Sequence, residues 1–222
     1  MHRLLNIKVI YLFFIFFCLV NSNLSLSDEL IVTKTKNPTK IIDLYGNKFF
    51  ISKNYILKVG DYAVSRNENS YFIFENIKIC LGSNSSIKFN EISYKDNHIV
   101  IEHLRGSVFI HNKNYRKLKI KLKVLNNFIT KFNKIYVNHF NKNKFIFHSF
   151  SQISFKENEK SQINLKKNFS YKFDNILAKT KIKNILNDPL ITQCKLEKNI
   201  GNNKKNLFRC FPNGTKITCG YK

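Results

Sequence analysis

The residues most able to do chemistry in this chain are its histidines, acids and cysteines. His98, His103 and His111 lie near Asp96 and Glu102, and imidazole and carboxylate groups together can bind a metal ion. His98 and His103, however, are an odd number of positions apart, so a strand directs them to opposite faces. The sequence has no His-x-His or Cys-x-x-Cys pair, no Gly-x-Ser-x-Gly and no phosphate-binding glycine loop. We therefore predict no catalytic residue, no metal site and no cofactor.

The cysteines of the chain are candidates for disulfide bonds. Cys18 lies within an apolar N-terminal run, and four more follow it: Cys80, Cys194, Cys210 and Cys219. An even number of cysteines in an exported chain predicts up to two disulfides, and four free thiols are the alternative. If Asn213-Gly214 forms a hairpin loop, Cys210 lies opposite Ile217 rather than Cys219, which disfavours a bond between those two cysteines. We therefore expect Cys194 to pair with Cys210 or Cys219.

Apolar and polar residues alternate along most of the chain, and this period of two is typical of half-buried strands. In residues 117–124, apolar side chains face one way and lysines face the other. Glu75-Asn76 fits a two-residue hairpin turn. Many short strands separated by polar turns predict an all-β fold, either a sandwich or a solenoid-like stack. The other expected strands are 49–51, 54–59, 70–74, 77–81, 86–89, 98–104, 107–110, 127–130, 134–137, 144–147, 152–155, 162–165 and 169–173.

The lysine row of residues 117–124 has two interpretations. It is either a stripe that binds polyanions, or the solvated face of a strand or of a sheet edge that is protected against aggregation. We favour the second interpretation.

The pattern changes after Asp174. Apolar residues at 178, 182, 185 and 186 fit one face of a helix, so we predict a short helix over residues 176–186. Asn187-Asp188-Pro189 ends it, because the residue before a proline avoids the helical conformation. Segments 208–211 and 215–219 then flank Pro212-Asn213-Gly214 and predict a small cysteine-containing hairpin tail at the C-terminus.

The N-terminus has the three-part layout of a secretory signal peptide. Arg3 and Lys8 are followed by an uncharged apolar run over residues 9–20 and by small or medium residues at 20–22. The run is shorter than the ~20 residues that span a bilayer. We expect cleavage near residue 22 and a mature protein that is periplasmic or secreted. An uncleaved N-terminal anchor is the alternative, and a lipoprotein is disfavoured because Phe16-Phe17, not small residues, precede Cys18.

The chain carries a strong positive charge. The formal net charge is +24, and most of the 38 basic residues are lysines in a chain rich in Asn, Ile and Phe. Part of this charge therefore reflects A/T-rich codons, but attraction to anionic polymers follows in any case. Hydrophobic residues make up 43% and aromatics 14%, which is enough for a packed core. For an exported chain the matching partners are anionic glycans and lipid headgroups, and no nucleic acid is expected.

Two glycine turns follow one another at a defined distance. Residues 81–87 read Leu-Gly-Ser-Asn-Ser-Ser-Ile, and residues 104–108 read Leu-Arg-Gly-Ser-Val, with Gly60-Asp61 placed before both. Gly82 and Gly106 mark places where a positive φ or a close backbone approach is needed.

This order resembles the FecR domain, a periplasmic β-rich domain of ferric-citrate signalling regulators, over residues 55–173. The family's later Gly-Thr and closing Gly-Gln elements fall at 130–137 and 165–169, where this chain lacks their glycines. The resemblance implies a module that binds a partner or receives a signal. The transmembrane members also carry a cytoplasmic segment that acts on a sigma factor. Only residues 1–8 precede the apolar run here, so sigma-factor control is not implied.

The candidate binding loops are those of the two turns, with the residues Gly82, Asn84, Ser86, Arg105 and Gly106. We divide the chain into a signal peptide (1–22), an N-terminal extension with the first strands (23–54), a FecR-like β-domain (55–175) and a short helix with a Cys-rich tail (176–222).

We predict an exported, non-enzymatic FecR-like module of the bacterial cell envelope, with an envelope protein, an anionic glycan or a lipid headgroup as its partner. The first alternative is a carbohydrate-active or other envelope enzyme, which needs carboxylates such as Glu91, Asp96 and Glu102 to meet in one cleft. The second is a general polyanion-binding protein, whose binding is lost at ~150 mM salt.

Overall fold

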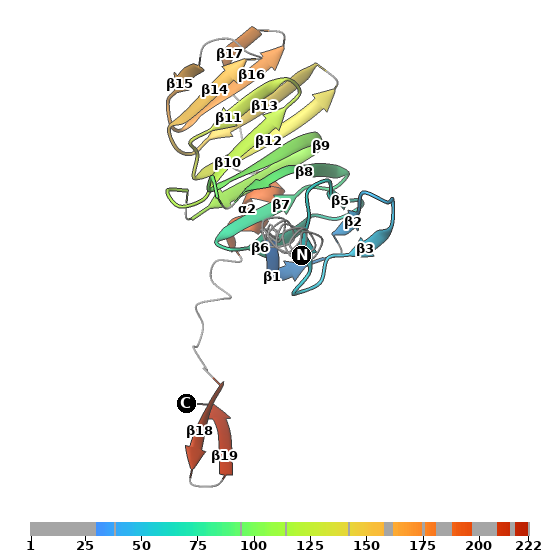
Figure 1. Ribbon diagram of the computed structural model, residues 1–222. Helices are drawn as coiled ribbons and strands as arrows, with labels where there is room; N and C mark the ends of the chain where they lie inside the picture. Colours follow the sequence, from blue (N-terminus) through green and yellow to red (C-terminus); the bar gives the residue numbers. More distant parts are fainter. Residues whose placement is uncertain are drawn as a thin grey trace, which may run out of the picture.

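The computed structural model describes residues 30–37, 39–93, 95–113, 115–141, 143–157, 162–174, 176–180 and 188–196, and the backbone of 208–213 and 216–221. Strands make up most of these residues, so the predicted all-β class is confirmed (Figure 1). The predicted signal peptide lies outside the described residues. The described part has no helix with the length and apolar character needed to cross a membrane.

The elements, in chain order, are β1 (Leu30–Lys36), β2 (Lys40–Ile42), β3 (Lys48–Phe50), β4 (Ile56–Leu57), β5 (Tyr62–Ser65), β6 (Ser70–Phe74), β7 (Ile77–Leu81), β8 (Ser85–Ser93), β9 (His98–Asn112), β10 (Lys119–Val124), β11 (Asn127–Thr130), β12 (Lys134–Asn141), β13 (Lys144–Ser149), β14 (Ile153–Glu157), β15 (Gln162–Leu165), β16 (Phe169–Asp174), β17 (Ile176–Thr180), α2 (Pro189–Leu196), β18 (Phe208–Asn213) and β19 (Lys216–Tyr221).

Two sheets share one long strand. Sheet I has the order β3-β2-β5-β8-β9-β10-β11-β14-β15, and sheet II has the order β1-β6-β7-β9-β12-β13-β16-β17. These neighbours pair antiparallel except β9 and β10, which run parallel. Residues 30–50, predicted as part of an N-terminal extension, supply β1–β3 to both sheets. Figure 1 shows the strands stacked into one continuous two-layer body.

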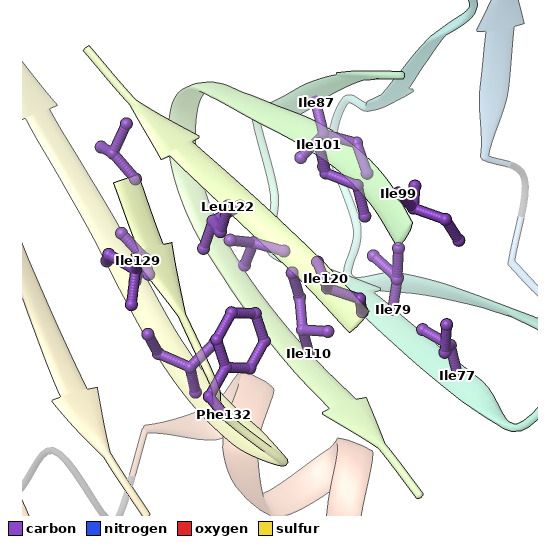
Figure 2. Close-up of a cluster of buried hydrophobic side chains, with 14 of the residues drawn as sticks. Ile77, Ile79, Ile87, Ile99, Ile101, Ile110, Ile120, Leu122, Ile129 and Phe132 are labelled. Atoms are coloured by element: carbon purple, nitrogen blue, oxygen red, sulfur yellow. The ribbon is translucent and has the colours of Figure 1, made fainter. Parts of the chain in front are cut away.

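The core fills the space between the two sheets. It consists of the inward-facing side chains of both sheets, mostly Ile, Leu, Val and Phe (Figure 2). Ile99 and Ile101 of sheet I and Ile79 and Ile110 of sheet II are fully buried in it. Each such side chain contributes about 1.5–3 kcal/mol of hydrophobic stabilisation, and the alternation in the sequence predicts which residues face inward.

Strand β9 changes sheets at Gly106. Its residues 98–105 pair with β8 or β10 in sheet I, whereas residues 106–112 pair with β12 or β7 in sheet II. Gly106 has a φ of 74°, a conformation that glycine adopts without a steric penalty. The bend makes a corner where the end of β5, the start of β8 and the middle of β9 lie side by side.

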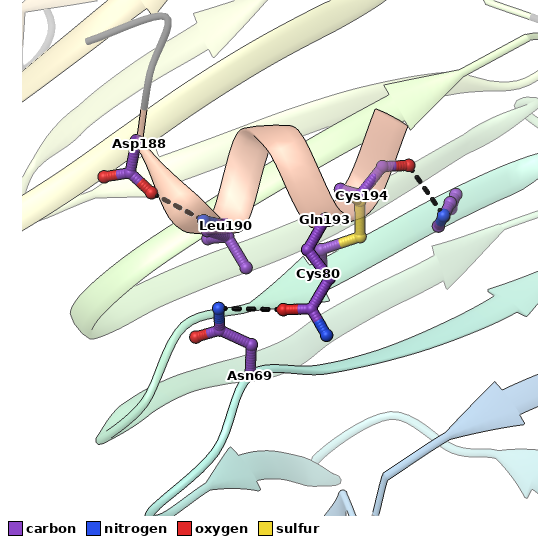
Figure 3. The surroundings of a disulfide bond; sticks show 7 residues. Asn69, Cys80, Asp188, Leu190, Gln193 and Cys194 are labelled. Atoms are coloured by element: carbon purple, nitrogen blue, oxygen red, sulfur yellow. Dashed lines mark hydrogen bonds between the residues drawn. A yellow bond between two sulfur atoms is a disulfide. The ribbon is translucent and has the colours of Figure 1, made fainter. Parts of the chain in front are cut away.

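The outer face of sheet II carries a second apolar cluster. Tyr71, Cys80, Phe109 and Tyr136 are successive partners across four strands, and α2 covers them with Leu190, Ile191 and Cys194. The Cys80–Cys194 disulfide closes a separation of 114 residues and fixes α2 to β7 (Figure 3). The expectation of a disulfide is thus confirmed, but the preferred pairing of Cys194 with Cys210 or Cys219 is wrong.

The hairpin tail also differs from the prediction. Cys210 is the direct partner of Cys219 in the β18–β19 pair, and Asn213 pairs with Lys216. This register places Cys210 opposite Cys219 rather than opposite Ile217, and it removes the reason for disfavouring a Cys210–Cys219 bond.

The predicted helix over 176–186 is wrong where the structure describes it. Residues 176–180 form β17, which pairs with β16 at the end of sheet II, because an unpaired edge of β16 outweighs a weak helical pattern. Residues 181–187 lie outside the described part.

The short helix instead begins at Pro189, with Asp188 as its N-cap. Oδ1 of Asp188 accepts a hydrogen bond from the Leu190 N–H at 2.8 Å. Proline is favoured at the first helical position, so Asp188-Pro189 starts a helix rather than ending one.

The lysine-rich strand is an interior strand, not an edge. β10 lies between β9 and β11, and its inward residues Ile120, Leu122 and Val124 are buried. The predicted alternation is confirmed, while the notion of a protected sheet edge is wrong. Its lysines lie on the outer face of sheet I.

Candidate functional site

The two predicted turns meet at the corner where β9 changes sheets. The Gly82 N–H donates to the Ser107 carbonyl oxygen at 2.9 Å, and the Ser107 N–H donates to Oγ of Ser85 at 2.8 Å. Ser86 is the register partner of Arg105. The turn over 82–86 and the turn over 105–107 therefore form one unit, which we call the corner.

Close packing at the corner requires a glycine at position 106. A Cβ on Gly106 would lie 2.7 Å from the Ser85 Cα and 2.9 Å from the Asn84 carbonyl oxygen, and real Cβ atoms do not approach backbone atoms so closely. A Cβ on Gly82 would meet only the Ser107 hydroxyl, which can rotate away. Gly82 and Gly106 thus bring the turns together but present no side chain to a partner.

Three side chains of the corner face solvent. Asn84 and Arg105 are exposed, and so is Arg66, which follows β5. The Asn84 N–H donates to the Arg66 carbonyl oxygen at 2.6 Å, so Asn84 lies between the two arginines across neighbouring strand ends. In the described part of the chain, neither guanidinium forms an ion pair with a carboxylate. Ser86 is buried and serves the structure of the turn.

A shallow cavity of about 320 Å³ adjoins the corner. Arg66 lines it together with Lys40, Phe50, Val64, Ser65, Asn67, Glu68 and Asn37. Phe50 is an exposed aromatic side chain, and Nζ of Lys40 lies 5.8 Å from the centre of its ring. The cavity therefore offers two cationic groups, one carboxylate and an aromatic face beside the two turns.

The acids singled out from the sequence do not meet in one cleft. Glu91 contacts His98 at 2.7 Å, and Asp96 accepts a hydrogen bond from Ser93. Glu102 forms an ion pair with Lys123 at 3.0 Å. Burial alone would raise the pKa of Glu102, but the hydrogen bonds from Asn90 and Lys123 lower it overall. Each acid thus has its own partner, and the described residues hold no group of three His, Cys, Asp or Glu suited to a metal ion.

One cavity does bring two carboxylates together. It has about 490 Å³, and Asp43 and Asp61 line it with the exposed side chains of Leu44, Tyr45, Phe49 and Val59. Asp61 is almost fully buried, and its Oδ2 accepts hydrogen bonds from the Lys58 N–H and the Tyr55 hydroxyl. Burial raises the pKa of Asp61 despite these bonds. The hydrogen bond from the Asn47 side chain lowers the pKa of Asp43.

Gly60-Asp61, the third element of the resemblance, has a structural role in this arrangement. Gly60 has a φ of 92°, and its N–H donates to the Phe89 carbonyl oxygen. The Phe89 N–H donates in turn to the carbonyl oxygen of Asp61. These bonds attach the loop before β5 to β8.

Comparisons with known proteins do not identify a family for this chain. No protein-family model matches the chain, and no curated protein matches it. The fold is similar to two crystal structures of a protein from Parabacteroides distasonis ATCC 8503 that is provisionally described as an anti-sigma factor. Each match has 10% identity and a TM-score of 0.45, and covers 53% of this chain and 57% of that chain. The chain thus spans little more than half of those solved chains, and a likeness of this strength carries no functional argument.

Proposed function

We propose that this chain is an exported, non-enzymatic FecR-like module of the bacterial cell envelope, and that the corner binds an anionic partner there. The partner is an anionic glycan, a lipid headgroup or an acidic patch on an envelope protein. The N-terminal segment supports export, and the order of the glycine turns supports the FecR-like character.

The observation that carries the proposal is that two arginines at the corner form no ion pair with any carboxylate that the structure describes. Arg66 and Arg105 flank Asn84, and backbone hydrogen bonds hold all three positions. Only five of the 38 basic residues are arginines, and two of these five lie at the corner. A guanidinium presents its donors in a fixed fork that suits carboxylate, sulfate and phosphate oxygens. Because this planar fork is already arranged, an arginine loses less entropy per hydrogen bond formed than a lysine does.

The test compares two variants of equal charge. Arg66→Gln with Arg105→Gln removes two positive charges at the corner. Lys117→Gln with Lys119→Gln removes two from exposed side chains near the start of β10. Retention on immobilised lipopolysaccharide and on heparin is then measured as the salt concentration that elutes each protein.

The proposal predicts that the wild type stays bound above ~150 mM salt, where surface attraction at a distance is largely screened. The arginine variant elutes at clearly lower salt, and the lysine variant elutes close to the wild type. Equal shifts for both variants would mean general charge attraction and would contradict a defined site.

A second candidate function is an envelope enzyme that acts on glycans. It is favoured by the cavity that Asp43 and Asp61 share with exposed Tyr45 and Phe49, because paired carboxylates and aromatic faces are typical of sugar-cleaving sites. Asp61, however, already accepts two hydrogen bonds and is almost fully buried. Release of reducing ends from cell-wall glycan by the wild type but not by Asp43→Asn would favour this enzyme over the binding module.

A further inference from the structure

Two histidines lie where aliphatic residues are expected. In β9, the inward-facing row runs Ile99, Ile101, His103, and in β12 it runs Ile135, Val137, His139. The four aliphatic side chains are fully buried, and His103 is 1% exposed. The two rows belong to opposite sheets and end at the same corner, since His139 is the register partner of Gly106.

The two imidazole rings lie close together, and three of their four nitrogens have no hydrogen-bond partner. Their centroids are 5.8 Å apart. Nε2 of His103 lies 3.1 Å from the Arg105 carbonyl oxygen, but Nδ1 of His103 and both ring nitrogens of His139 are buried without a hydrogen-bond partner. A buried polar atom without a partner destabilises the folded state, so three such atoms in a sandwich core require an explanation.

The hydrogen bond to Arg105 sets the tautomer of His103. A carbonyl oxygen only accepts, so Nε2 carries the proton and Nδ1 carries a free lone pair. A backbone carbonyl that holds one ring nitrogen while the other is free is the usual second-shell arrangement of a metal-binding histidine.

We propose that His103 and His139 form a two-nitrogen binding site for a late transition-metal ion, with copper(I) as the favoured ion. Imidazole nitrogen is a good ligand for copper, and copper(I) is stable with two ligands, whereas zinc in proteins almost always takes four. An ion about 2 Å from a nitrogen of each ring places the two centroids roughly 6 Å apart. The observed centroid separation of 5.8 Å fits this geometry.

A different explanation uses no metal. A small rotation, or a bridging water, lets an N–H of His139 donate to Nδ1 of His103. This alternative satisfies the nitrogens but predicts no affinity for copper, so metal binding separates the two.

The test measures copper(I) uptake by the full chain against a chromogenic copper(I) chelator, with ascorbate to keep the metal reduced. The site variant is His103→Leu with His139→Leu, which completes both aliphatic rows and removes the unpaired nitrogens. We expect it to fold with a thermal midpoint no lower than that of the wild type. Because cysteine thiolates also bind copper(I), all variants keep every cysteine, and only the difference between proteins is interpreted.

The wild type is expected to remove one equivalent of copper(I) more than the double variant, with nitrogen neighbours in the X-ray absorption spectrum. His139→Leu alone, at the more accessible position, should weaken uptake at least tenfold. His98→Asn, which alters the His98–Glu91 pair instead, should leave uptake unchanged. Equal uptake by wild type and double variant, no uptake by the wild type, or loss of uptake in His98→Asn would each overturn the proposal.

Discussion

Replacing Gly106 with alanine tests whether the corner depends on a backbone position without a side chain. Two costs add at this site. A φ of 74° costs an alanine about 1–2 kcal/mol in the left-handed region. The new Cβ would also meet the Ser85 Cα at 2.7 Å and the Asn84 carbonyl oxygen at 2.9 Å, and such overpacking costs about 1–3 kcal/mol. The expected loss in free energy of unfolding is therefore about 2–5 kcal/mol.

Gly46 provides a matched control for this substitution. Its φ is 81°, and a Cβ there would have no atom within 4 Å. Gly46→Ala should therefore show only the conformational cost of about 1–2 kcal/mol. The difference between the two variants isolates the contact between the turns.

The assay is urea unfolding followed by far-UV circular dichroism and tyrosine fluorescence, since the chain has 10 Tyr and no Trp. An unchanged slope with a lowered midpoint indicates a change in stability alone. The reasoning is refuted if Gly106→Ala and Gly46→Ala lower the free energy of unfolding by the same amount within about 0.5 kcal/mol, the scatter expected of ordinary surface changes.

Four further predictions follow from the described contacts. Cys80→Ala with Cys194→Ala should lower the free energy of unfolding in urea by about 2–5 kcal/mol, because the bond closes a separation of 114 residues. Asp188→Ala should cost about 1–2 kcal/mol and speed dithiothreitol reduction of that disulfide, because it removes the α2 N-cap and the 2.7 Å bond from the Tyr136 hydroxyl; an unchanged reduction rate would contradict this role. The pKa of His103 is depressed from 6.5 to about 3 in the folded state, so this group's contribution to stability is present above pH 6.5 and lost as pH falls toward 3. Between pH 5.5 and 4, metal-free wild type should lose about 1.4 kcal/mol per pH unit more than His103→Leu, and parallel pH curves would refute this. Cys210 and Cys219 are direct partners in β18–β19, so alkylation of the denatured, non-reduced protein should leave both unlabelled; labelling of either means that they are not bonded.

Much of the fold follows from alternation that is visible in the sequence. Ile120, Leu122 and Val124 are buried as the pattern of β10 predicts, since a strand that buries one face needs apolar residues at every second position. Gly82 and Gly106 could also be predicted as places of close approach, because glycine inside a strand pattern marks a bend or a contact between backbones.

The sequence does not predict which distant segments of the chain contact one another. Cys80 and Cys194 are far apart in the chain, and their bond depends on how α2 crosses sheet II, which no local pattern specifies. In the sequence, Pro189 is compatible with the end of one helix and with the start of another. The hydrogen bond from the Leu190 N–H to Asp188 shows that a helix starts there. The sequence does contain a sign of the His103–His139 contact, because the inward-facing rows of β9 and β12 both end in histidine. Only the pairing of β9 with β12 brings those two ends together.

The most direct test of the proposed binding face is photocrosslinking in intact cells. A photoreactive residue is placed at Ser83 or at Lys167; both are exposed, and each precedes an asparagine with positive φ in a turn. Figure 1 shows β15 and β16, which flank Lys167, at the opposite end of the stack from β5. The account predicts an adduct with an envelope component from position 83 and none from position 167. Adducts of equal yield from both positions, or a protein that stays in the cytosol and crosslinks to nothing in the envelope, would contradict it.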